Sequence, residues 1–100
     1  MTNVEIRTDS LTLPDKEQFL LSCGRVVERI TASAPSDSII HMAVDFDGAD
    51  YLVNLDLVSG ELNFSSVANA KSAFVALEKI HKDSIERIKK WSATRKIEVA

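Results

Sequence analysis

Apolar and polar side chains alternate along residues 38–65, and this alternation is the clearest pattern in the chain. A period of two is typical of strands that bury one face. Two dipeptides that favour turns, Asp47-Gly48 and Ser59-Gly60, divide the stretch into three segments. The pattern therefore predicts a three-stranded antiparallel meander with a two-residue turn at each dipeptide.

The two turns predict a single register for the meander. The expected cross-strand pairs are Phe46 with Ala49, Val44 with Tyr51, Met42 with Val53, Ile40 with Leu55, Leu57 with Leu62, and Leu55 with Phe64. All of these lie on one face, and the other face collects His41, Asp45, Asp50, Asn54, Asp56, Glu61, Asn63 and Ser65. A slip of one residue would mix the two sets. The apolar face needs a cover, whereas the polar face tolerates water.

A strand and a helix are predicted before the meander. Residues 4–7 alternate in the manner of a strand. Pro14 suits the first helical position, and the acidic Asp15 and Glu17 suit the positive end of the helix dipole. The apolar stripe of this helix comprises Phe19, Cys23, Val26, Val27 and Ile30. Gly24 lies in the helix interior, where it predicts the close approach of a neighbouring group.

A second helix is predicted after the meander. Residues 66–69 are expected to turn the chain, and the helix then runs for about five to six turns to near Trp91. Its apolar stripe comprises Ala73, Leu77, Ile80, Ser84, Ile88 and Trp91, widened by Phe74, His81 and Ile85. The side opposite this stripe is rich in lysine.

The elements follow one another as β-α-β-β-β-α in a single domain, residues 1–100. The first two strands should be parallel, because a helix connects them by a right-handed crossover. Both helices need an apolar surface, so we expect an α+β fold in which a four-stranded mixed sheet carries two helices on one face. The residues expected to face the helices are Val4, Ile6, Ile40, Met42, Val44, Val53, Leu55, Leu57, Leu62 and Phe64. The core should span about residues 3–91, and residues 92–100 are expected to form a flexible tail.

The net charge, the single cysteine and the lengths of the apolar runs limit the kinds of partner and compartment that the protein can have. The net charge of −3 argues against indiscriminate binding to nucleic acid but permits a local basic face. The single Cys23 fits a reducing compartment, and no apolar run approaches the roughly 18 residues of a membrane span. We therefore expect a cytoplasmic protein, with no membrane or DNA partner.

Two candidate chemical sites fail on spacing or placement. Asp45, Asp47, Gly48 and Asp50 suggest a calcium loop, but the required sixth-position Gly and twelfth-position Glu are absent. Cys23 with His41 or His81 suggests a nucleophile and a base. Cys23 belongs to the apolar stripe, however, and His41 to the opposite face of the sheet. We expect no catalytic residue, no metal and no cofactor.

The remaining candidate is a group of helical cations. Arg25 and Arg29 lie one turn apart on the first helix, and Lys79 and Lys82 lie on the second. If the helices pack side by side, these four residues would form one outward patch that contacts phosphates. The alternative is a solvated helix face, since acidic residues such as Glu86 are interleaved with the cations.

The chain resembles the short ribosome hibernation promoting factor and ribosome-associated protein Y family. The similar passages are Val4-Glu5-Ile6-Arg7 and Leu11-Thr12-Leu13-Pro14 before the first helix; Ile39-Ile40-His41-Met42; Gly60-Glu61-Leu62 followed by Ser65; and Ser72-Ala73-Phe74 with Leu77, Ile85, Arg87 and Ile88 in the second helix. Together they cover residues 4–91, and their order and spacing carry the resemblance.

The resemblance implies a non-enzymatic regulator that binds the small ribosomal subunit at its decoding region and silences or stores ribosomes. It implies contact with ribosomal RNA through Arg25, Arg29, Lys79, Lys82, Arg87 and Lys90. The sequence departs from the family before the second helix, where Ala68-Asn69-Ala70-Lys71 replaces the usual acidic residue and aromatic. A second interpretation stays open: a protein-interaction module of the same fold that has lost RNA binding and uses the acidic sheet face or a sheet edge, for example in a homodimer.

Overall fold

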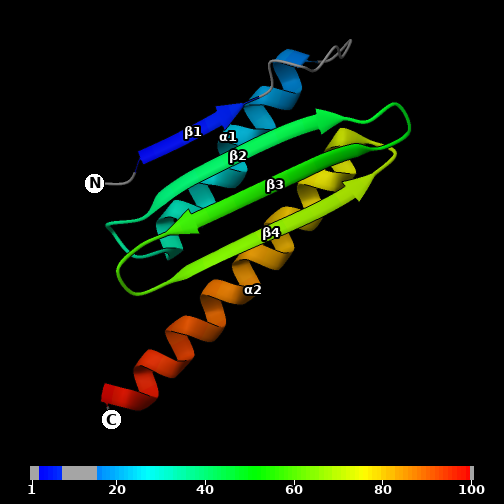
Figure 1. Cartoon of the computed structure of the whole chain (residues 1–100). Coiled ribbons are helices and arrows are strands. Elements are labelled where there is room, and N and C mark those ends of the chain that lie inside the picture. The colour runs from blue at the N-terminus through cyan, green and yellow to red at the C-terminus, as the bar shows by residue number, and fades with distance from the viewer. Residues whose placement is uncertain (1–2, 8–15, 100) are drawn as a thin grey trace.

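The computed structural model describes residues 3–7 and 16–99, and it has the predicted order of elements (Figure 1). The elements are β1 (Asn3–Arg7), α1 (Lys16–Ser33), β2 (Ile39–Phe46), β3 (Tyr51–Val58), β4 (Asn63–Ala70) and α2 (Ala73–Val99). The expected helix start at Pro14 and Asp15 lies outside the described residues.

The four strands form one sheet in the order β1-β2-β3-β4. β1 is parallel to β2, and the other neighbours are antiparallel, as predicted. Both helices lie on the same side of the sheet, and α2 packs against β3 and β4 (Figure 1). The α+β fold with a mixed sheet and two helices is therefore confirmed.

The register of the meander differs from the prediction by two residues at each turn. Phe46 pairs with Tyr51 rather than Ala49, and Leu57 pairs with Phe64 rather than Leu62. The predicted two-residue turns were wrong because each connection contains four residues.

Side chains at the first position of each turn explain the longer connections. The Asp47 carboxylate accepts the backbone N–H groups of Ala49 and Asp50, at 2.9 and 2.7 Å, and Gly48 adopts a positive φ of 97°. The Ser59 hydroxyl accepts the N–H of Leu62 at 2.8 Å, and the Ser59 N–H donates to the Leu62 carbonyl at 3.0 Å. Short polar side chains that bond the backbone locally define such turns.

A shift of two residues preserves the faces, because side chains in a strand alternate with a period of two. The buried core residues on the sheet are Ile40, Met42, Val44, Val53, Leu55 and Leu57, and those on the helices are Phe19, Cys23, Val27, Ile30, Ala73, Ala76, Leu77, Ile80 and Ile88. Ile6, Leu62 and Phe64 are partly buried against this core. Val4, on the edge strand β1, is an exception and is 45% exposed.

The junction between β4 and α2 also differs from the prediction. Residues 66–69 continue β4 instead of turning, and they pair with residues 52–55 of β3. α2 has 27 residues and continues to Val99, beyond the expected end near Trp91. At about 1.5 Å per residue it is about 40 Å long, so its C-terminal part extends beyond the sheet (Figure 1). The flexibility expected for residues 92–100 stays a prediction.

Gly24 does not have the close neighbour that its place in α1 predicted. It is exposed, and a Cβ atom built there meets nothing within 4 Å. Gly24→Ala should therefore raise the free energy of unfolding by about 0.5–1 kcal/mol, since alanine lowers the backbone entropy lost on folding. Thermal and urea denaturation would measure the gain, and a loss of stability would show that the site is sterically restricted.

Candidate nucleic-acid interface

Charge is unevenly distributed between the two helices and the rest of the chain. The helices carry ten cationic residues, Lys16, Arg25, Arg29, Lys79, Lys82, Arg87, Lys89, Lys90, Arg95 and Lys96, and six anionic ones, Glu17, Glu28, Glu78, Asp83, Glu86 and Glu98. The rest of the chain carries two cationic and nine anionic residues. The helices are thus net +4 and the remainder net −7, although the whole chain is only −3. The helices are therefore basic, although the whole chain is acidic.

Arg25 and Arg29 occupy the predicted position on α1. Both are exposed and one helical turn apart, and Phe19, Cys23 and Ile30 are buried on the other side of the helix. The helical period of the apolar stripe accounts for this placement. The two guanidinium groups are therefore accessible to an anionic partner.

The cations of α2 do not all lie beside Arg25 and Arg29. The Lys79 ammonium donates to the Asn69 carbonyl on β4 at 3.3 Å, and the Arg87 guanidinium carbon lies 5.6 Å from the centre of the Phe64 ring, also on β4. β4 is one of the two edge strands, and α1 packs on the other flank of α2, where the ring centres of Phe19 and Phe74 lie 5.3 Å apart.

By their contacts, the predicted cations fall into two groups, and the single patch across both helices stays a prediction. We call Arg25, Arg29 and Lys82 the outer group, since all three are exposed helical residues for which the described residues give no hydrogen bond or ion pair. We call Lys79, Arg87 and Lys90 the edge group, because Lys79 and Arg87 contact β4 and Lys90 lines a hollow beside it.

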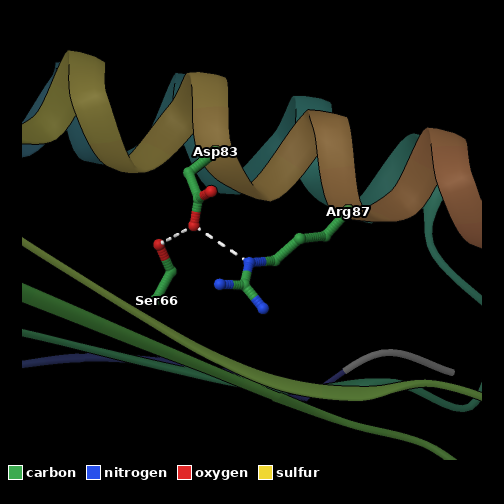
Figure 2. Close-up of polar contacts among 3 residues, drawn as sticks. All are labelled: Ser66, Asp83 and Arg87. Atoms are coloured by element: carbon green, nitrogen blue, oxygen red, sulfur yellow. Dashed lines mark hydrogen bonds and ion pairs between the residues drawn. The ribbon is translucent and has the colours of Figure 1, made fainter.

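A polar network ties the edge group to β4. The Ser66 hydroxyl donates to Asp83 Oδ2 at 2.5 Å, and Arg87 Nε donates to the same oxygen at 3.0 Å (Figure 2). The hydrogen bond from Ser66, followed by the hydrogen bond and charge of Arg87, lowers the pKa of Asp83, although partial burial opposes this shift. Asp83 is therefore an ionised residue at neutral pH.

This network was not predicted from the sequence, because Ser66 was expected to lie in a turn. Ser66 is a β4 residue, 3% exposed, on the face that meets α2. The local sequence offers one signal, the i,i+4 spacing of Asp83 and Arg87, which predicts their ion pair.

A hollow of about 380 Å³ lies beside the network. Its lining residues are Leu62, Asn63, Phe64, Asp83, Glu86, Arg87 and Lys90. Two predicted RNA-binding residues, Arg87 and Lys90, are thus brought together here, next to two carboxylates.

The opposite face of the sheet is polar and acidic, as predicted. His41 Nδ1 lies 3.1 Å from the Glu5 carboxylate, and the Ser65 hydroxyl donates to Asp56 at 2.5 Å. This face also bears exposed apolar side chains, including Val58 and Val67. It is chemically distinct from the helical layer.

The described residues do not assemble a metal site or a membrane span. No group of three or more His, Cys, Asp or Glu in this part of the chain could hold a metal ion. None of the helices described is long and apolar enough to cross a membrane.

Cys23 is packed in the core rather than placed for reaction. It is fully buried, and burial raises the pKa of its thiol to about 11, so the thiolate is scarce at neutral pH. The native protein should therefore resist thiol-labelling reagents at pH 7 and react only after unfolding. Rapid labelling of the native protein would contradict this and would reopen the question of a nucleophile.

Comparisons with known proteins give a match at the level of structure. No protein-family model and no curated protein sequence matches the chain. The N-terminal domain of Protein Y from Thermus thermophilus superposes with a TM-score of 0.68 at 9% identity, covering 91% of this chain and 99% of that domain. A ribosomal subunit interface protein from Coxiella burnetii superposes with a TM-score of 0.66 at 11% identity, covering 92% and 97%. The resemblance inferred from the sequence is thus confirmed for the fold.

Proposed function

We propose that the protein is a ribosome-binding regulator of translation that contacts RNA of the small ribosomal subunit through the layer formed by α1 and α2. The observation that carries this proposal is the segregation of charge, with net +4 on the helices and net −7 elsewhere. A basic pair of helices attracts phosphates and releases their counterions on contact, whereas the acidic remainder of the chain repels them. The polarity of the molecule would therefore orient it on RNA.

The shared fold supports the same function. One structural neighbour is a domain of Protein Y, and another is described as a ribosomal subunit interface protein. Both match over more than nine-tenths of this chain. By analogy with these neighbours, we propose a cytoplasmic, non-enzymatic role at the ribosome, without a cofactor.

The proposed contact residues are those of the outer and edge groups. The outer group would place exposed cations against the RNA backbone, since such contacts position a protein without reading sequence. The edge group would make a second line of contacts along the β4 side of α2. Interleaved acidic residues, such as Glu28 and Glu86, would lower the affinity of this surface.

The alternative function is a protein-interaction module that uses the open sheet face. Ile39, Val58 and Val67 are 40%, 49% and 69% exposed on this face, beside several carboxylates. Apolar side chains beside carboxylates are better suited to a protein partner than to RNA.

Cosedimentation with ribosomes over a range of salt concentrations tests the proposed function. A surface that makes three or four phosphate contacts should give a log-log slope of about −2 to −4 for affinity against salt concentration. Absence of binding at low salt, or binding that does not respond to salt, would contradict the RNA contact and favour the interaction module.

A further inference from the structure

The Arg87 guanidinium is held in place from two directions. Its Nε donates to Asp83 at 3.0 Å, and its guanidinium carbon lies over the Phe64 ring, 5.6 Å from the ring centre. Asp83 is in turn fixed by the hydroxyl of the buried Ser66 on β4. Arg87 is therefore a pre-ordered cation, because both α2 and the sheet determine the position of its head group.

The carboxylate engages only one of the guanidinium nitrogens. Figure 2 shows the contact from Asp83 ending on Nε, and no dashed line reaches either terminal nitrogen of Arg87. Within the described residues, no hydrogen bond acceptor is found for these two terminal nitrogens. A planar pair of such donors matches two oxygens of a phosphate group.

The surroundings of Arg87 suit a phosphate. The hollow of about 380 Å³ beside it is also lined by Lys90, which is a second cation. Asp83 already has two donors, Ser66 and Arg87, so its charge is partly compensated. Glu86 is the other carboxylate of the lining, and it would oppose an anion there.

We propose that Arg87 binds a phosphate of the RNA backbone through its two terminal nitrogens, and that Asp83 is its positioning residue. This inference rests on the proposed function and adds a specific role to the edge group. Asp83 then assists RNA binding although it is negatively charged. Arg87 differs from Arg25, which is exposed without an aromatic or a carboxylate contact among the described residues.

Two substitutions on α2, each of which neutralises one carboxylate, distinguish this proposal from the alternative that any carboxylate near Arg87 only repels RNA. Asp83→Asn should weaken ribosome association about two- to tenfold, because the charged hydrogen bond that orients Arg87 is lost. Glu86→Gln removes the same charge from the same hollow and should strengthen association by about twofold, as the loss of one repulsive charge predicts. If both variants bind more tightly than the wild type, the positioning role of Asp83 is wrong.

A matched pair of Arg→Lys substitutions tests whether the two terminal nitrogens of Arg87 are needed for binding. Arg87→Lys retains the charge but loses the paired donors, and it should weaken association by about tenfold. Arg7→Lys, at an exposed arginine of β1 outside the helical layer, is the control and should bind as well as the wild type. Equal losses in the two variants would overturn the special role of Arg87. Melting curves of all four variants should remain close to that of the wild type, which shows that the comparison is made on folded protein.

A measurement without ribosomes separates failure of this inference from failure of the proposed function. The side-chain Nε–H signals of Arg87 and of Arg7 on β1 would be followed by NMR while inorganic phosphate is added to the wild-type protein. The Arg87 signal should shift and saturate, and the Arg7 signal should change only weakly. An Arg87 signal that does not respond would refute the phosphate site even if the protein binds ribosomes, whereas saturation without ribosome binding would retain the site and reject the proposed function.

Discussion

Leu55→Ala is expected to lower the free energy of unfolding by about 2–5 kcal/mol, the range for truncating a buried leucine. Leu55 is 0% exposed in β3, and its neighbours across the sheet are Met42 on β2 and Ser66 on β4. α2 packs over β3, so the shortened side chain would leave a cavity between the sheet and the helix. Urea denaturation followed by circular dichroism measures the loss.

Asn54→Ala is the control for this substitution. Asn54 is the preceding residue of β3, and its exposed side chain lies on the open face. Its replacement should change the free energy of unfolding by less than about 0.5 kcal/mol, as is usual for a surface site. Comparable losses at the two positions would contradict the assignment of faces.

The faces of the sheet could be predicted from the sequence, whereas the pairing of residues could not. Alternation identifies which side chains share a face, and this information survives a shift of two residues. The register depends instead on the number of residues in each turn. Asp47 and Ser59 lengthen their turns by bonding backbone groups two and three residues ahead, and the prediction treated the glycines alone as the turn signal.

The boundary between β4 and α2 was missed for a different reason. Residues 66–69 have the sequence Ser-Val-Ala-Asn, which has no strong apolar alternation, so a turn was the simpler prediction. Pairing with β3 makes this segment a strand, and that pairing is a tertiary contact. The same error concealed Ser66 and therefore the network with Asp83.

The site was predictable where helical periodicity determines exposure. Arg25 and Arg29 are exposed because the opposite side of α1 is buried, and the sequence shows this directly. Lys79 and Arg87 needed more than periodicity, since their long side chains bend toward acceptors and a ring on β4. The division into outer and edge groups therefore required the packing of α2 against the edge strand.

Reversal of charge in the outer group is expected to weaken ribosome association about 100-fold or more, because juxtaposing like charges at an interface costs several kcal/mol. The substitutions are Arg25→Glu and Lys82→Glu in one protein. Lys82 is chosen in place of Lys79, whose ammonium already contacts Asn69. Each lost phosphate contact should also reduce the magnitude of the salt slope by about 1. Both side chains are exposed, so the melting curve should change little.

The matched control reverses two carboxylates on the open sheet face, with Glu5→Lys and Asp45→Lys in one protein. Both residues are exposed on the face that points away from the helices. Because phosphate contact is proposed only for the helical layer, this variant should cosediment with ribosomes as well as the wild type, with an unchanged salt slope. The opposite result, in which the sheet variant loses binding and the helix variant retains it, would move the contact surface to the open face. The acidic sheet would then be the docking surface, and its partner would be a protein rather than RNA.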